Sequence, residues 1–207
     1  MIHIKNTEYI IFDVETTGLS PTEGDRIVEI AAVKLKGNTI VAEFESLINP
    51  NRALPASATL VNGITQEMIQ DAPLAAKVLP QLIDFIGGAA VVGHNVKFDL
   101  GFLCYELSLA GRKLRDETPA IDTLKMAKGL IPYLSSYRLE YLANALGVSV
   151  NVTHRALSDV KLTCEAFKRM LDMACDNQLI DFHLLIQRFG VEKPNFPIRQ
   201  ITQEMLF

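Results

Sequence analysis

Apolar residues in the first quarter of the chain occur in short runs that are typical of β-strands. Residues 9–15 are mostly β-branched or aromatic, and they predict a largely buried strand. Two further strand-like runs follow at 26–36 and 39–48. The Gly37-Asn38 pair between these two runs is a hairpin signal. This part of the chain is therefore expected to form an antiparallel meander.

Helical spacing of apolar residues replaces this pattern after residue 70. Apolar positions three and four residues apart predict helices over residues 74–86, 98–110, 139–146 and 156–174. Ser136 is the expected N-cap of the third of these helices. Between the first two helices, residues 89–93 form a short, bounded apolar run, as expected of a buried parallel strand.

Strands at the start, followed by alternating strands and helices, indicate an α/β domain whose mixed sheet is flanked by helices. We assign residues 1–175 to this domain. Residues 176–192 are predicted to be a helical extension, because their apolar residues have amphipathic spacing. This extension either packs on the core or contacts a partner. Residues 193–207 are predicted to be an extended linker, marked by two prolines, and a C-terminal tail.

Size and composition allow one domain with a substantial core, because 49% of the 207 residues are hydrophobic. No apolar run approaches the roughly 20 residues of a membrane span, and the N-terminus lacks the pattern of a signal peptide. Cys104, Cys164 and Cys175 have no paired spacing, which is typical of a reducing compartment. We therefore expect a cytoplasmic protein without membrane contact.

The formal net charge of −4 argues against a broad electrostatic grip on duplex DNA. It does not exclude a nucleic-acid substrate, because two bound divalent cations would add four positive charges at the scissile phosphate. Small basic groups occur at 112–115 and at Lys125 and Lys128. We interpret these groups as solvated surface.

Asp13 and Glu15 form the first of three acidic clusters. They are two residues apart on a predicted strand, so both side chains leave the same face of the sheet. Adjacent carboxylates repel each other unless a cation lies between them. Their position at the end of a buried strand, where solvation is poor, favours a metal site over a chance pair.

The second cluster follows the apolar run at 89–93 and reads His94-Asn95-Val96-Lys97-Phe98-Asp99. Asn95 and Asp99 are four apart and are expected on one face of a helix, with Asn95 either positioning Asp99 or capping the helix. This helix begins at the carboxyl end of a parallel strand, where open α/β sheets place their ligands. Phe98 is expected to pack in the core rather than stack on a base, and His94 is interpreted as an ordinary loop histidine.

His154 and Asp159 belong to the third cluster. On one continuous helix, residues five apart would point about 140° away from each other. They converge only if His154 lies on a loop and Asp159 in the first turns of the helix. A histidine beside a metal-bound water suits a general base. Asp122 is either a further metal ligand or the N-cap of the helix that follows it.

The three clusters resemble the Exo I, Exo II and Exo III motifs of the DnaQ-like (DEDDh) 3′–5′ exonucleases. The similarity extends through 61–65, where Asn62 replaces the histidine of the family's H-G-I-T turn, and through 136–140. It covers about residues 7–175, which the resemblance makes the exonuclease domain. It implies a ribonuclease H-like fold and the stepwise release of nucleoside monophosphates from a 3′ end.

The resemblance also implies roles for individual residues. Asp13, Glu15, Asp99 and Asp159 would bind two divalent cations, Mg²⁺ or Mn²⁺, with Asp13 bridging them, and His154 would be the general base. The candidate substrate-binding residues are Thr16, Thr17, Gly18, Leu19, Asn95 and Phe98. Leu19 is the one expected to wedge against the terminal base.

The last five residues, Gln203-Glu204-Met205-Leu206-Phe207, resemble the Q-x-x-L-F peptide by which bacterial replication proteins dock on the sliding clamp. Gln203, Leu206 and Phe207 would make that contact. A linker ahead of such a peptide raises the effective concentration of an enzyme near its substrate. The clamp and a DNA polymerase subunit are therefore candidate partners.

The preferred hypothesis is an enzyme that acts on a single-stranded or frayed 3′ end of DNA in proofreading or repair. An RNA-trimming exonuclease of the same fold, like RNase T or oligoribonuclease, stays open, because no residue here reveals how a 2′-hydroxyl is read. A non-catalytic adaptor that binds a polymerase or clamp is the alternative from another class. An acid–base pair as in a glycosidase leaves His154 and two acids without a role.

Overall fold

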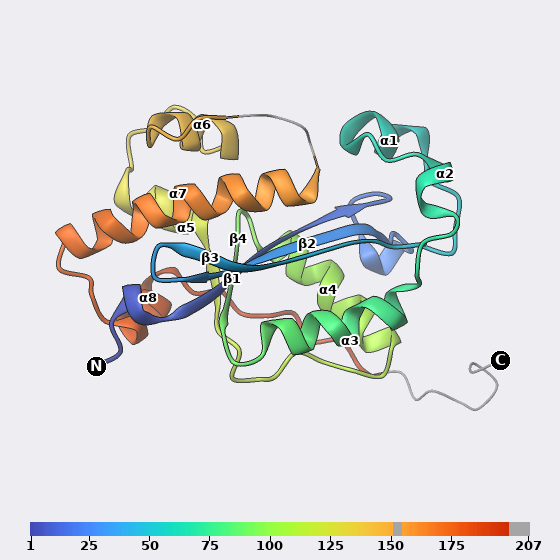
Figure 1. Ribbon diagram of the computed structural model, residues 1–207, viewed down its shortest axis with the longest axis horizontal. Helices are drawn as coiled ribbons and strands as arrows, with labels where there is room; N and C mark the ends of the chain where they lie inside the picture. Colours follow the sequence, from blue (N-terminus) through green and yellow to red (C-terminus); the bar gives the residue numbers. More distant parts are fainter. Residues whose placement is uncertain (151–154, 199–207) are drawn as a thin grey trace.

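The computed structural model describes residues 1–150 and 155–198, and its centre is a five-stranded mixed sheet with helices on both faces (Figure 1). The strand order is β3-β2-β1-β4-β5. The antiparallel meander consists of β1 (Glu8–Thr16), β2 (Ile27–Lys36) and β3 (Thr39–Leu47). Two short strands, β4 (Ala90–Gly93) and β5 (Ala120–Asp122), run parallel to β1. The predicted mixed sheet is confirmed.

Helices connect the strands and close both faces of the sheet. They are η1 (Ile4–Asn6), η2 (Pro21–Glu23), α1 (Ala56–Asn62), α2 (Gln66–Ile69), α3 (Ala75–Ile86), α4 (Lys97–Leu109), α5 (Thr123–Leu130), α6 (Leu139–Ala145), α7 (Ala156–Asp176) and α8 (Phe182–Phe189). Across residues 1–150 and 155–198, none of them is long and apolar enough to cross a membrane.

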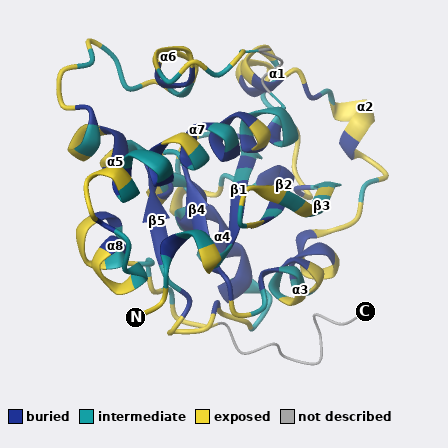
Figure 2. Cartoon of the chain, turned by 60° about the vertical axis from the view of Figure 1, so that its left-hand side comes forward, coloured by how far each residue is buried: buried dark blue, intermediate teal, exposed yellow. Residues whose placement is uncertain are grey.

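The side chains of β1 alternate between two hydrophobic clusters, because successive residues of a strand point to opposite faces. Tyr9 and Ile11 belong to the cluster that also contains buried residues of α5, α7 and α8. Ile10 and Phe12 belong to the cluster on the other face, with residues of α3 and α4. Figure 2 shows the buried strands between these two layers of helices. The sheet is therefore covered on both sides, which explains its nearly continuous apolar strands.

Local signals account for most of the boundaries. Gly37 has a φ of +60° in the turn of the β2–β3 hairpin, and α3 ends at Gly87, whose φ is +58°. Both conformations lie in the left-handed region that favours glycine. The predicted helices over 74–86, 98–110 and 156–174 correspond to α3, α4 and α7.

Ser136 does not occupy the predicted N-cap position. The helix begins at Leu139, with Arg138 at the N-cap, and the Ser136 hydroxyl accepts the backbone N–H of Arg138 at 3.3 Å. Serine often bonds the amide two residues ahead, and here that bond shapes the turn before the helix. β5 was not predicted, because three residues are too few to show a periodic pattern.

The segment after α7 packs on the sheet domain. Leu185 and Phe189 of α8 are buried in the same cluster as β1 and α7. The amides of Ile4 and Phe182 donate to the carbonyls of Ile180 and Ile2, both at 2.8–2.9 Å, so the segment is hydrogen-bonded to the N-terminus. These contacts answer the question that the amphipathic pattern left open, in favour of packing on the core.

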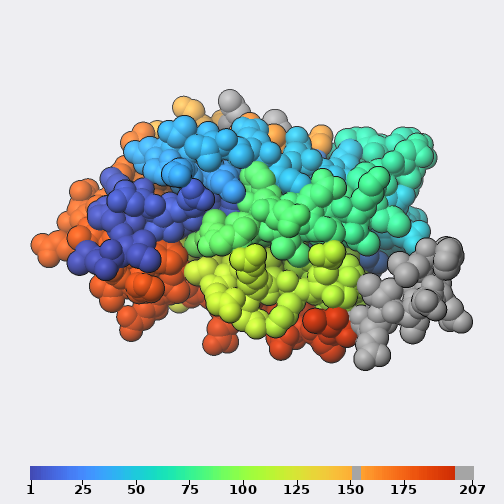
Figure 3. Space-filling view, turned by 60° about the horizontal axis from the view of Figure 1, so that its bottom comes forward, coloured from blue at the N-terminus to red at the C-terminus, as the bar shows by residue number. Residues whose placement is uncertain are grey.

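Residues 191–198 form no helix or strand and lie against the segment that precedes β5, as the red and yellow-green atoms of Figure 3 show. The Lys193 ammonium donates to the carbonyls of Arg115, Asp116 and Thr118 at 2.5–3.0 Å. The Phe196 ring contacts the ring of Tyr105, with centroids 5.3 Å apart. The first part of the expected linker is therefore fastened to the domain.

Candidate active site

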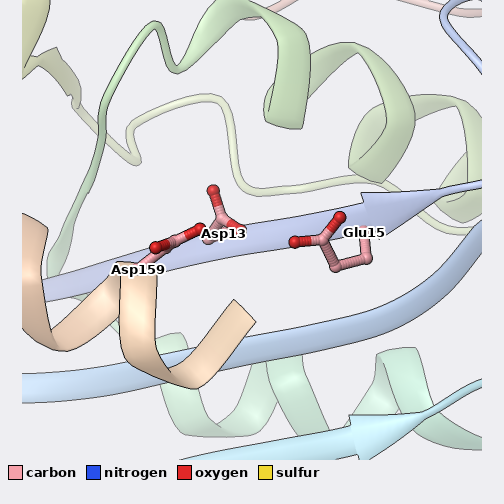
Figure 4. Close-up of side chains that lie close together, drawn as sticks. All are labelled: Asp13, Glu15 and Asp159. Carbon is pink, nitrogen blue, oxygen red and sulfur yellow. The ribbon is translucent and has the colours of Figure 1, made fainter. Parts of the chain in front are cut away.

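Asp13, Glu15 and Asp159 converge over the β1 strand (Figure 4). Asp13 and Glu15 leave the same face of β1, and Asp159 lies in the first turn of α7, as predicted. One carboxylate oxygen of each lies within 4.8 Å of the others. Three hard oxygen donors at this spacing can hold a divalent cation such as Mg²⁺, Mn²⁺ or Ca²⁺.

Asp99 joins this cluster from the opposite face of the sheet. β1 extends beyond the last residue pair that it forms with β4, Ile11 with Val92. The backbone N–H of Val14, past that point, donates to Asp99 Oδ1 at 3.1 Å. Asp99 is buried, and this bond places its carboxylate against the β1 residue that follows Asp13; its charge raises the pKa of Asp13. All four predicted acids therefore gather at one end of the sheet.

The electrostatics of this cluster are unfavourable without a cation. Burial, followed by the charges of Asp99, Glu15 and Asp159, raises the pKa of Asp13 well above its ordinary value. Burial and then the charge of Asp159 raise the pKa of Glu15 to about 7. Burial raises the pKa of Asp99 to about 8, although the Val14 N–H opposes this shift. A bound cation would relieve both the repulsion and the desolvation.

A buried ion pair fixes the helix that carries Asp159. Glu29 of β2 has no exposed surface, and its carboxylate accepts hydrogen bonds from Arg155 Nε and Nη2. It also accepts the backbone N–H of Ala156 at 3.1 Å, at the start of α7. Glu29 lies directly opposite Glu15 in the β1–β2 register. The N-terminus of α7 is thus held beside the metal-ligand candidates of β1.

A second buried pair holds the helix that carries Asp99. Glu106 of α4 is buried and accepts Arg26 Nε and Nη2 at 2.6 Å each. The same carboxylate accepts the amide of Ile27 at 3.4 Å, at the start of β2. Two-point arginine–carboxylate contacts have a defined orientation. Both helices that deliver acids to the site are therefore fastened to β2.

The sequence patterns did not predict a role for four of these residues: Glu29, Arg155, Arg26 and Glu106. One signal was available for Glu29, because a carboxylate inside the apolar run Ile27-Val28-Glu29-Ile30 needs a partner just as Asp13 does. The identity of that partner was not visible, since Arg155 is 126 residues away along the chain.

The turn after β1 is fixed by Asp25. Thr17 is buried, and its hydroxyl donates to Asp25 Oδ1 at 3.0 Å. A Cβ on Gly18 would lie 2.3 Å from the Asp25 carboxylate, so only glycine fits there. The Thr16 hydroxyl donates to the Gly18 carbonyl at 2.6 Å, while Leu19 is 85% exposed. Of these candidate substrate contacts, Leu19 offers a free side chain and Thr17 does not.

Asn95 does not share a helical face with Asp99, contrary to the prediction. α4 begins at Lys97 with Val96 at the N-cap, and Asn95 lies in the preceding turn with a φ of +62°. Asparagine tolerates this left-handed conformation better than most residues do. Its exposed side chain neither caps α4 nor shares a face with Asp99. Phe98 is partly buried against Phe102, with ring centroids 5.1 Å apart, as predicted.

Asp122 occupies the N-cap of α5. Its Oδ1 accepts the backbone N–H groups of Leu124 at 2.9 Å and of Asn95 at 3.0 Å. These two bonds favour the capping interpretation over a further metal ligand. His94 contacts the Thr123 hydroxyl at 2.9 Å and the Tyr137 carbonyl at 2.8 Å. Burial lowers the pKa of His94, which indicates a neutral, structural imidazole.

Asn62 links the α1 turn to the site. Its side chain is buried and accepts the backbone N–H of Ile64 at 3.0 Å. The Asn62 amide lowers the pKa of Glu15 and opposes part of the effect of burial. Gly63, with a φ of +70°, ends α1 next to it. His154 lies outside the described residues.

Comparison with known proteins agrees with this arrangement. The exonuclease family model RNase_T matches residues 10–167. The chain is 40% identical over 198 residues to a DNA polymerase III PolC-type of Caldanaerobacter subterraneus, which is 94% of this chain and 14% of the relative. It is 40% identical over 167 residues to a DNA polymerase III subunit epsilon-like protein of Rhodobacter capsulatus, 79% of this chain and 23% of the relative. The chain thus spans less than a quarter of the length of these curated relatives.

Solved structures show the same fold. The nuclease domain of 3′hExo, described as a DEDDh family member bound to rAMP, has a TM-score of 0.75 at 21% identity and covers 93% of this chain and 100% of that chain. Exonuclease X in complex with 5′ overhanging duplex DNA has a TM-score of 0.66 at 27% identity and covers 82% of this chain and 93% of that chain. The predicted ribonuclease H-like fold is confirmed.

Removal of the Arg155 side chain should destabilise the protein strongly. Arg155→Ala leaves the buried Glu29 carboxylate without its cation; because the Arg155 side chain is 36% exposed, the expected cost is about 2–3 kcal/mol, below that of a fully buried pair. Urea unfolding at neutral pH measures this loss. The matched control is Lys161→Ala on the same helix, because Lys161 pairs with Glu43 at 3.0 Å and both side chains are 45% exposed. The control should lose less than about 1 kcal/mol; equal losses in the two variants would contradict the assigned role of the buried pair.

The metal-free protein should lose stability as the pH rises from about 4.5 to about 7. The pKa of Glu15 is about 7 in the folded state, against an ordinary 4.5, so the folded state binds the proton more tightly than the unfolded state does. The resulting stabilisation is present below pH 4.5 and disappears as Glu15 ionises in the fold. Thermal melting in EDTA between pH 5 and pH 8 tests this.

Two additions make that measurement specific to the site. Glu15→Gln should reduce the pH dependence without abolishing it, because the pKa values of Asp13 and Asp99 are raised as well, whereas Glu8→Gln, on the same strand but 42% exposed, should leave it unchanged. Mn²⁺ should restore the melting temperature at pH 8 in the unsubstituted protein. A melting temperature that Mn²⁺ leaves unchanged would argue against a cation site at these carboxylates.

Proposed function

We propose that this chain, which belongs to the RNase_T exonuclease family, removes nucleotides one at a time from 3′ ends and releases nucleoside monophosphates. The observation that carries this proposal is the convergence of Asp13, Glu15 and Asp159 within 4.8 Å, with Asp99 bonded to the Val14 amide next to them on β1. Phosphodiester hydrolysis with two metal ions requires such a set of carboxylates at one point.

The residues present fit two divalent cations, Mg²⁺ or Mn²⁺. All the donors are carboxylate oxygens, and their raised pKa values indicate a site that lacks compensating positive charge. When bound, the two ions would activate a water and stabilise the leaving 3′ oxygen. Asp13 is the proposed ligand of both ions, because the charges of Asp99, Glu15 and Asp159 all raise its pKa.

His154 remains the proposed general base. Its neighbour Arg155 is held by Glu29, so the chain enters α7 at a defined place next to the carboxylates. A histidine there would accept a proton from water while the acids hold the ions. His94 does not compete for this role, because both of its ring nitrogens are already engaged.

DNA is the proposed substrate, in the form of a single-stranded or frayed 3′ end in proofreading or repair. The relatives at 40% identity are DNA polymerase III proteins, and all four acids are present, which argues against a non-catalytic adaptor. The RNA-trimming alternative is supported by a structural neighbour at 21% identity, a 3′-exonuclease described as recognising a histone mRNA stem-loop. Leu19, exposed on the turn after β1, is the proposed wedge against the terminal base.

The decisive measurement is the product pattern on oligonucleotides that carry a label at the 5′ or the 3′ end. With Mg²⁺, a label at the 3′ end should be released as a mononucleotide from the start of the reaction. A strand labelled at its 5′ end should shorten by one nucleotide at a time. Asp159→Asn should lower the rate by about 100-fold or more, because even loss of a group that only supports a metal ligand costs about 10- to 100-fold. Asp172→Asn is the control on the same helix, since Asp172 pairs with Lys5 at the surface. Release of the 5′ label as mononucleotide would reverse the proposed direction, and matched DNA and RNA strands decide the substrate.

The C-terminal peptide is proposed to bind a bacterial sliding clamp. Gln203, Leu206 and Phe207 lie outside the described residues, so the proposal depends on the sequence alone. The chain lacking 203–207 should lose retention on an immobilised clamp while its activity on a short oligonucleotide is unchanged. Equal retention of the two chains would end this proposal.

A further inference from the structure

A crevice opens at the carboxyl ends of β4 and β5, where the chain leaves the two strands in opposite directions. β4 continues into α4, which packs on one face of the sheet, and β5 continues into α5, which packs on the other. Figure 2 shows α4 and α5 on either side of these strands. Neighbouring parallel strands that diverge in this way create a binding crevice outside their carboxyl ends.

Three lysines line this crevice, which has a volume of about 460 Å³. Lys97 begins α4, and Lys125 and Lys128 lie one turn apart on α5; all three are exposed. The Lys125 ammonium donates to the Gly190 carbonyl at 2.9 Å, and that of Lys128 lies 5.8 Å from the centre of the Tyr137 ring. We refer to this site as the lysine crevice.

Two acidic residues also line the crevice, but only one of them offsets the positive charge of the lysines. The Asp122 side chain is 6% exposed, and its Oδ1 already accepts two backbone N–H groups. Glu192 is exposed on the rim. The open part of the crevice therefore presents three ammonium groups and one carboxylate, although the chain as a whole carries a net charge of −4.

The lysine crevice adjoins the carboxylate cluster through the first turn of α4. Lys97 and Asp99 both lie in that turn. Asp99 reaches β1 through the Val14 amide, and Asp122, in the crevice, holds the amide of Asn95 just before α4. A strand whose 3′ terminus lies at Asp13 and Glu15 would need only a few nucleotides to reach Lys97.

We propose that the lysine crevice binds the phosphodiester backbone of the substrate strand, several nucleotides before its 3′ end. This inference builds on the proposed function and names a second contact that this function does not require. Ammonium groups bind phosphate as point charges, without reading the base, so the contact is independent of sequence. It places positive charge next to the carboxylate cluster in a chain whose net charge is −4.

Two consequences distinguish this contact from binding at the metal site. Oligonucleotides too short to reach the crevice do not use it, so the effect of the lysines depends on strand length. The logarithm of the binding constant falls linearly with the logarithm of the salt concentration. Each lost lysine–phosphate contact makes the slope of this line shallower by about 0.7 for a single strand. Binding of the terminal nucleotide alone has neither property.

The test measures binding in Asp159→Asn protein with Ca²⁺, so that cleavage does not interfere. Fluorescence anisotropy compares labelled dT₃ and dT₁₅, and their uridine counterparts, at several salt concentrations. Lys125→Gln/Lys128→Gln should weaken binding of the long strand about tenfold and reduce the salt slope by about 1.4, with the short strand unchanged. The control is Lys34→Gln/Lys36→Gln, because Lys36 pairs with Glu8 at the opposite end of β1.

A substitution of the opposite sign sharpens the test. Glu192→Gln removes the exposed carboxylate of the rim and should strengthen binding of the long strand. The proposal is overturned if the lysine variant binds the long strand as tightly as the parent, or if short and long strands weaken equally. If the parent protein shows no 3′–5′ cleavage but its lysines still act on long strands alone, the proposed function is refuted and the phosphate contact in the crevice is supported. The two proposals can therefore fail independently.

Discussion

The buried pair between Glu29 and Arg155 is the contact on which the site most depends. Asp159 is delivered by α7, a helix far along the chain from β1, whose N-cap residue Arg155 makes no side-chain capping bond. The Glu29 carboxylate holds the start of that helix by accepting both the Arg155 guanidinium and the first amide of the helix. Because Glu29 faces Glu15 across the β1–β2 ladder, the same contact sets the distance between the acids of β1 and the acid of α7.

Buried carboxylates serve two different purposes in this molecule. Glu29 and Glu106 are each matched by an arginine and by a backbone amide, so their burial organises the fold. Asp13 and Asp99 are crowded at one end of the sheet, and burial raises the pKa of each. Uncompensated acids of this kind are typical of sites that await a cation. The two carboxylates that are paired with arginines thus position the helices that carry the unpaired acids of the site.

The same end of the sheet accounts for both proposed contacts with a nucleic-acid strand. β1 runs past the end of β4, which leaves the Val14 amide for Asp99 and opens room for the carboxylate cluster. One strand further along, α4 and α5 diverge to opposite faces and form the lysine crevice. A strand can therefore meet cations at its 3′ terminus and ammonium groups further back, which suits an acidic protein that binds phosphate only where it is needed.

Local sequence patterns were enough to predict the fold class, the paired acids of β1 and the helices that carry Asp99 and Asp159. These follow from periods of two and 3.6 residues and from the cost of leaving a carboxylate in an apolar run, which are local properties. Four features became visible only in the folded chain: the partner of Glu29, the turn conformation that keeps Asn95 out of the helix, the short strand β5, and the proximity of Lys97 to Lys125 and Lys128. Each of these depends on contacts between residues distant in the chain, or on an element too short to repeat its pattern, and neither leaves a periodic signal in the sequence.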